Sequence, residues 1–205
     1  MRKAFQFGAL VRRECSIPWD EFTDLFRAFI REEPRTIAIE EMGRAIRETQ
    51  FADQQEVDNF VKKVCRWGGY PPIAARVLQN NTPEQITTAF RNATARLTNQ
   101  NPDVGCALEE IDTLDGLDVS FASKHLRLLF PERCPVLDSI ISNRMFYKKS
   151  LEEYRRFASH CAMIAATLTQ EHIENPVGQR QGWWYTADVE ASLYAFLRPE
   201  RYRRG

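Results

Sequence analysis

Residues 114–124 read Leu114-Asp115-Gly116-Leu117-Asp118-Val119-Ser120-Phe121-Ala122-Ser123-Lys124, a tight turn followed by the start of an apolar helix. Ala107, Leu108 and Ile111 have the spacing of a buried helix face before this turn. Pro131 ends the helix that follows it. The chain then continues with Pro135-Val136-Leu137-Asp138-Ser139, an apolar link with an aspartate at the start of a third helix. Residues 104–147 are therefore predicted to form a helical hairpin, a link and another helix.

Helix signals continue on both sides of this segment. Phe22, Phe26 and Phe29 recur at helical spacing. Capping residues stand before further apolar stripes, namely Asp53 with Glu56, Thr82 with Gln85 and Ser150 with Glu153. Alternating strand patterns are nearly absent. We predict an all-α fold of about eight helices, one domain over 1–205, with N-terminal helices in 1–54 and a helical core in 55–197.

Composition excludes several classes of protein. Of the 205 residues, 43% are hydrophobic and 27% are charged, which is typical of a folded globular chain. The sequence contains neither a membrane-spanning apolar run nor an N-terminal signal peptide. Its five cysteines are scattered, and no two have CxxC spacing. We expect a cytoplasmic protein without a membrane anchor, a metal site or an organic cofactor; the oligomeric state stays open.

Charge is distributed unevenly along the chain. The formal net charge is zero, yet residues 20–60 contain eleven acidic against five basic residues. Residues 121–156 contain eight basic against four acidic residues, and residues 198–205 add four arginines against one glutamate. A neutral protein with such a distribution can present one basic face to phosphate groups. Solvated helix faces explain the same charges equally well.

The order of helix, glycine turn, helix, apolar link and aspartate resembles the helix-hairpin-helix DNA glycosylases. The similarity is greatest to the 8-oxoguanine DNA glycosylase branch, through Ser120–Leu126 and Pro135–Ser139. The resemblance covers residues 55–197, and its most specific part is the segment 114–139. The chain resembles a minimal bacterial type that occurs beside anti-phage defence genes.

This resemblance implies catalytic roles for Lys124 and Asp138. A neutral lysine amine displaces a base from its sugar and forms a Schiff base, which then permits cleavage at the 3′ phosphate. Burial and the positive end of a helix both lower the pKa of a lysine, which favours the neutral amine. A nearby aspartate takes up the proton and stabilises positive charge on the sugar. The same aspartate also suits the N-cap of the following helix.

Other residues are candidates for contacts with DNA. For the phosphate backbone these are Gly116 in the turn and Ser123, His125, Arg127, Arg144 and Lys148 after it. For the pocket of an extruded base they are Trp183, Trp184 and Asp188, which precede or begin the last predicted helix. Ordinary structural roles compete with each of these: solvated helix positions for the polar residues and core positions for the tryptophans.

The sequence thus predicts a DNA N-glycosylase, with AP-lyase activity, that excises a modified purine such as 8-oxoguanine from duplex DNA. The neutral net charge and the acidic residues of the turn favour a different class, a catalytically inactive module of the same fold that binds nucleic acid or a partner protein. A third hypothesis keeps the lysine chemistry but assigns it to a modified nucleotide in anti-phage defence.

Overall fold

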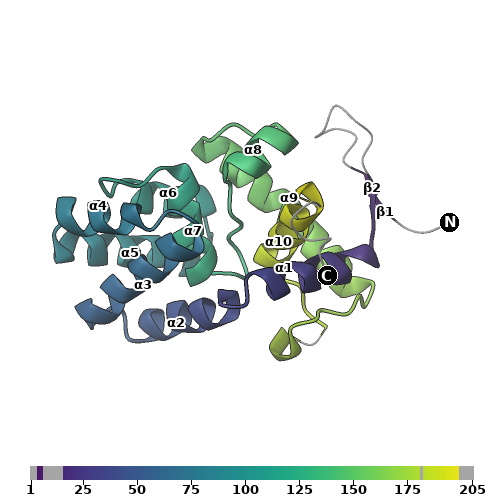
Figure 1. Cartoon of the computed structure of the whole chain (residues 1–205), viewed down its shortest axis with the longest axis horizontal. Coiled ribbons are helices and arrows are strands. Elements are labelled where there is room, and N and C mark those ends of the chain that lie inside the picture. Colours follow the sequence, from purple (N-terminus) through teal and green to yellow (C-terminus); the bar gives the residue numbers. More distant parts are fainter. Residues whose placement is uncertain (1–3, 7–15, 181, 199–205) are drawn as a thin grey trace.

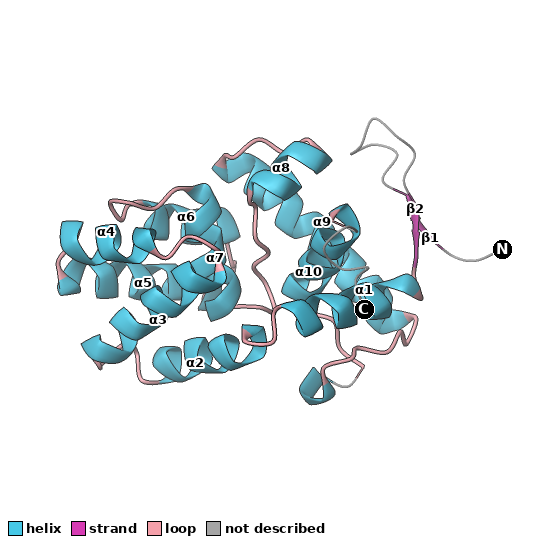
Figure 2. Ribbon diagram, in the orientation of Figure 1, coloured by secondary structure: helices cyan, strands magenta, loops and turns pink. Residues whose placement is uncertain are grey.

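The computed structural model describes residues 4–6, 16–180 and 182–198, and this part of the chain is almost wholly helical (Figures 1 and 2). Its ten α-helices and one short 3₁₀ helix confirm the predicted all-α class. The helices are α1 Glu21–Glu32, α2 Thr36–Glu48, α3 Gln54–Trp67, α4 Pro72–Asn80, α5 Pro83–Thr98, α6 Val104–Asp112, α7 Val119–Leu129, α8 Ser139–Met145, α9 Leu151–Gln170 and α10 Thr186–Leu197. The 3₁₀ helix η1 spans Gly178–Arg180.

The only described strands form a short antiparallel ribbon near the N-terminus. Strand β1, Ala4–Gln6, pairs with β2, Ser16–Pro18, so that Phe5 lies opposite Ile17. Ile17 is fully buried and β2 contacts α1, which fixes the ribbon to the helical body.

The helices group into two lobes (Figure 1). We call α2–α7 the first lobe and α1 with α8, α9 and α10 the second lobe. Within the first lobe α5 packs on α6 and α2 packs on α7, whereas α10 of the second lobe packs on α1, α8 and α9. Residues 130–138, here the link, run between the lobes, and α6 also contacts α9. Residues 1–54 are thus shared between the lobes, with α1 in the second and α2 in the first.

Side-chain caps start several helices where the sequence predicts them. Asp53 accepts hydrogen bonds from the Gln55 and Glu56 N–H groups at the start of α3. Thr82 and Gln85 form a reciprocal capping box at α5, and Ser150 caps α9. These caps satisfy N–H groups that have no partner within their own helix.

Two helices beyond the predicted eight are α2 and α4. Helix α2 has no side-chain cap, and α4 begins at Pro71-Pro72, which reads as a break in the sequence although proline suits a first helical turn. None of the helices in the described ranges combines the length and apolar character needed to cross a bilayer.

Candidate active site

The predicted helical hairpin is formed by α6, the turn 113–118 and α7. Gly116 has φ of 96°, a left-handed backbone conformation that favours glycine. The turn is held from outside, because the Asn81 side chain accepts a hydrogen bond from the Asp115 N–H and donates one to the Asp115 carbonyl. Asp118 caps α7 by accepting from the Phe121 N–H at 3.0 Å. The second turn of α7 carries Lys124.

The Lys124 side chain is buried, with 7% of its surface exposed. Its Nζ donates to Ser120 Oγ at 3.1 Å and lies 4.6 Å from the centre of the Phe121 ring. Its methylene groups pack on Gly68, where a β-carbon would come within 2.8 Å of Lys124 Cδ. Burial lowers the pKa of Lys124, and the charge of Asp138 opposes this effect only in part. The neutral amine is therefore favoured relative to an exposed lysine.

Asp138 lies at the end of the link and at the start of α8. Its Oδ1 accepts from the Ile140 and Ile141 N–H groups at 2.9 and 3.0 Å, so it is the N-cap that the sequence predicts. The link is positioned by Ser123, whose Oγ accepts from the Leu137 N–H at 3.1 Å and donates to the Ser120 carbonyl. Ser123 is fully buried, so its position is that of a structural residue and it does not reach a phosphate.

Lys124 and Asp138 line the same pocket, between the two lobes. Its volume is about 350 Å³, within the range of small-molecule sites. Its wall residues are Phe29, Glu33, Arg66, Trp67, Gly68, Gly69, Lys124, Val136, Asp138, Glu190, Tyr194 and Arg198. The aromatic members come from α1, α3 and α10, and the rings of Phe29 and Tyr194 meet edge to face at 6.2 Å. A planar group that enters beside Lys124 would therefore meet aromatic surfaces.

Glu190 of α10 is a wall residue that the sequence does not point to directly. Its side chain is 3% exposed, and burial raises its pKa to about 8, although Arg127 opposes the shift. Its Oε2 lies 3.8 Å from Arg127 Nε and has no hydrogen-bond partner. A sequence signal does exist, since Asp188 and Glu190 are the only carboxylates in a helix that is otherwise apolar on most sides.

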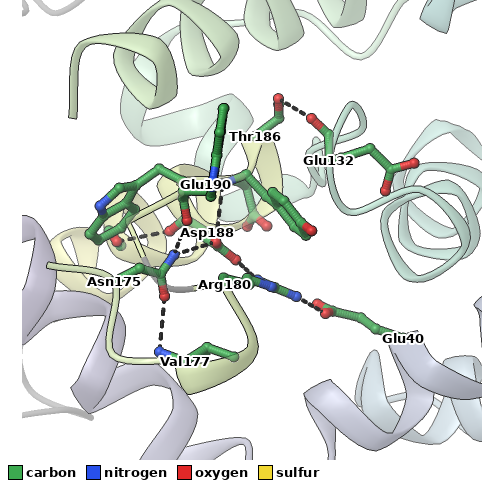
Figure 3. Close-up of polar contacts among 12 residues, drawn as sticks. Glu40, Glu132, Asn175, Val177, Arg180, Thr186, Asp188 and Glu190 are labelled. Carbon is green, nitrogen blue, oxygen red and sulfur yellow. Dashed lines mark hydrogen bonds and ion pairs between the residues drawn. The ribbon is translucent and has the colours of Figure 1, made fainter. Parts of the chain in front are cut away.

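A buried ionic network joins Glu40, Arg180 and Asp188 (Figure 3). Arg127 is fully buried and donates to Glu40 Oε1 at 2.5 Å. Arg180 bridges Glu40 and Asp188. Asp188 also accepts from Asn175 Nδ2 at 2.9 Å and from the Tyr185 N–H at 3.1 Å. Contrary to the predictions, Arg127 cannot reach a phosphate, and Asp188 does not line the pocket.

His125 is also in the core, contrary to the prediction of a phosphate contact. It is fully buried between Phe60 and Phe90, and its Nδ1 is 2.7 Å from the Phe121 carbonyl oxygen. Burial lowers its pKa to about 4, so the ring is neutral at pH 7.

The two candidate tryptophans differ in environment. Trp184 is buried against Phe22 and Phe26 and donates from Nε1 to the Ile173 carbonyl, whereas Trp183 is 67% exposed. Neither lines the pocket, whose aromatic walls are Phe29, Trp67 and Tyr194 instead. Arg144 and Lys148, on and after α8, are exposed, so both remain candidates for backbone contacts.

No three histidine, cysteine, aspartate or glutamate side chains in the described part of the chain gather as metal ligands would. The chain matches no known family model, and no curated protein or solved structure is significantly similar to it.

Proposed function

We propose that this protein is a cytoplasmic DNA N-glycosylase with AP-lyase activity, acting on a modified purine such as 8-oxoguanine. The observation that carries the proposal is that Lys124 and Asp138 line one pocket, where burial lowers the pKa of the lysine. A buried lysine with a lowered pKa beside a carboxylate has the chemistry of an amine nucleophile. A second line of support is the helical hairpin that precedes Lys124.

The reaction uses each group in a defined way. The Lys124 amine attacks C1′ of the damaged nucleotide, and the bond from C1′ to the base breaks. Two backbone N–H groups hold the Oδ1 of Asp138 in place, and the carboxylate stabilises the positive sugar ring. Opening of the sugar then gives the Schiff base, from which the 3′ phosphate leaves by β-elimination.

The position of the pocket suits an extruded base. It lies where helices of both lobes meet, and it brings aromatic rings and a nucleophile together. Enzymes that act on a base take it out of the stack and hold it between such side chains. The exposed Arg144 and Lys148 would contact the backbone outside the pocket.

A modified nucleotide is a second candidate substrate, and one feature of the hairpin favours it. Two N–H groups of the hairpin are already engaged within the protein, that of Asp115 by the Asn81 side chain and that of Phe121 by Asp118. The same turn carries two carboxylates, which repel a DNA phosphate. Under this alternative the lysine chemistry is the same, but binding to duplex DNA is weak.

Borohydride trapping tests the proposed function. Wild-type protein, Lys124→Gln and the control Lys62→Gln, an exposed lysine on α3, are incubated with an abasic duplex and reduced. We expect a covalent adduct with wild type and Lys62→Gln, and none with Lys124→Gln. If wild type forms no adduct, or if Lys124→Gln still forms it, the proposal is wrong. Adduct formation with an abasic nucleotide but not with the duplex would favour the second candidate.

A further inference from the structure

We propose that Glu190 is a further catalytic residue of this pocket, the general acid that protonates the departing base. This inference rests on the proposed function and adds to it, because Lys124 and Asp138 supply a nucleophile and an anion but no proton donor. The pocket then contains two carboxyl groups with opposite roles.

Asp138 and Glu190 have different surroundings, and these favour different roles for the two carboxyl groups. Asp138 Oδ1 accepts two backbone N–H groups, which stabilise a carboxylate. The Glu190 carboxyl is buried in the wall of the same pocket, and its Oε2 has no hydrogen-bond partner. Burying a carboxylate with one oxygen that lacks a hydrogen bond is costly, so Glu190 keeps its proton to a higher pH than an exposed glutamate. Its pKa is raised to about 8, although the Arg127 ion pair and a backbone hydrogen bond at Val136 lower it. Two carboxyl groups that differ in this way are assigned as acid and base.

Arg127, the nearest guanidinium group, does not form the close ion pair that would keep Glu190 deprotonated. Its Nη1 is engaged by Glu40 at 2.5 Å, and its Nε is 3.8 Å from Glu190 Oε2. That distance is too long for a hydrogen bond. Other ionisable groups interact with Glu190 or line the same pocket. They are Lys124 on α7, Asp138 before α8, Tyr154 and Cys161 on α9, Glu33 after α1, Arg66 on α3, and Tyr194 and Arg198 on or after α10.

The step balances without a further reactant. As the Lys124 nitrogen bonds to C1′, the electron pair of the bond between C1′ and the base leaves with the base. The Glu190 proton moves to a ring nitrogen, directly or through one water molecule, so the base departs neutral and Glu190 becomes a carboxylate. The Lys124 nitrogen then gives a proton to O4′ as the sugar opens and the Schiff base forms.

A base that leaves without taking up a proton makes it possible to tell whether Glu190 acts as a general acid or only as a structural residue. A neutral 8-oxoguanine or hypoxanthine departs as an anion unless it is protonated, whereas 7-methylguanine is already cationic and departs neutral. Single-turnover excision of all three bases and trapping on an abasic duplex are measured for wild type, Glu190→Gln, Glu190→Asp and the exposed control Glu152→Gln.

We expect Glu190→Gln to excise the two neutral purines about 100-fold more slowly than wild type, within the range for loss of a general acid. Its excision of 7-methylguanine and its trapping on abasic DNA are expected to stay near the wild-type level, which also checks that it folds. Glu190→Asp, which keeps the acid, should recover part of the rate. Wild-type excision of neutral purines should fall as the pH rises above about 8, and Glu190→Gln should lose this alkaline limb.

Three results would overturn the inference. One is Glu190→Gln excising neutral purines at the wild-type rate. Another is an equal loss on 7-methylguanine and on abasic DNA, since that indicates a structural role. The third is wild type that traps abasic DNA but excises no neutral purine between pH 5 and 9. Absence of any adduct with wild-type protein would instead refute the proposed function, and this inference with it.

Discussion

Lys124, His125 and Glu190 illustrate at the residue scale how burial changes the charge of a side chain. Burial is the largest cause of the pKa shift of each one, and in each case it favours the neutral form. Asp138, in the same pocket, has its Oδ1 held by two backbone N–H groups. The pocket thus combines a lysine and a glutamate whose neutral forms are favoured by burial with an aspartate that is held by backbone N–H groups.

His125 makes the stability of the protein depend on pH. Its pKa is about 4 in the folded chain and 6.5 when solvated, so the unfolded state binds the proton more tightly. The stability it contributes is complete above pH 6.5 and is lost as the pH falls from 6.5 to about 4. The loss amounts to about 3 kcal/mol at 1.36 kcal/mol per pKa unit.

We predict that His125→Phe removes this part of the acid sensitivity. The ring would pack between Phe60 and Phe90, and the buried Nε2, which has no hydrogen-bond partner, would be gone. Urea unfolding at pH 7.5 and at pH 4.5 measures the difference, with His172→Asn as the exposed control. If His125→Phe loses as much stability on acidification as wild type does, another group is responsible.

Prediction from the sequence succeeds at this scale where a residue type and a motif agree. Lys124 and Asp138, 14 positions apart in the sequence, line one pocket. Glu190 was missed because a glutamate in a helix is usually exposed, and only the packing of α1 and α9 on α10 buries it. The predicted phosphate contacts of His125 and Arg127 were wrong for a similar reason. The sequence alone does not show which face of α7 is covered by α2 and α3.

At the scale of the elements, α2 and α7 cross closely at Gly43. A β-carbon there would come within 2.2 Å of the Leu128 carbonyl oxygen, a backbone atom that cannot move aside alone. We predict that Gly43→Ala lowers the free energy of unfolding by about 3 kcal/mol, the upper range for overpacking. Gly178→Ala is the control because nothing lies within 4 Å of its β-carbon. Equal stability of the two variants in urea would mean that the helices separate easily.

The end of α3 packs closely on Lys124 in a similar way. Gly68 packs against the methylenes of Lys124 and the Phe121 ring. Gly68→Ala is predicted to displace the lysine side chain, which is flexible, with a loss of stability below about 1 kcal/mol. Borohydride trapping should slow about tenfold, because misplacement of a reacting group is costly. Unchanged trapping in a folded variant would show that the Lys124 methylenes have room to shift.

Helices with a cap and a regular apolar stripe were predictable, and α2 and α4 were not. Helix α2 begins without a side-chain cap, and its stability comes from packing on α3 and α7. Helix α4 follows two prolines, which are compatible with a helix start but are more common in loops. In both cases tertiary contacts decide what the local sequence leaves open.

For the whole molecule, Glu40 joins the lobes, since α2 belongs to the first lobe and Arg180 lies in the segment before α10 (Figure 3). Glu40→Gln would leave two buried guanidinium groups without their shared anion. We predict a loss of about 3–5 kcal/mol in the free energy of unfolding, as for other buried ion pairs that lose one partner. The exposed Glu41→Gln should change it by less than about 0.5 kcal/mol. Urea denaturation of both variants measures the difference, and a stable Glu40→Gln would contradict this role.

The pocket between the lobes also has a consequence for biosynthesis. Lys124 emerges from the ribosome well before Glu190 and Tyr194. Helix α1 cannot pack fully until α10, its main packing partner, has been synthesised. Until α10 is made, the Lys124 amine therefore lies in an incomplete, hydrated pocket, where its ammonium form is favoured. Under the proposed function, Lys124 would gain the environment of a nucleophile only when α10 docks, so a growing or truncated chain would not attack nucleic acid prematurely.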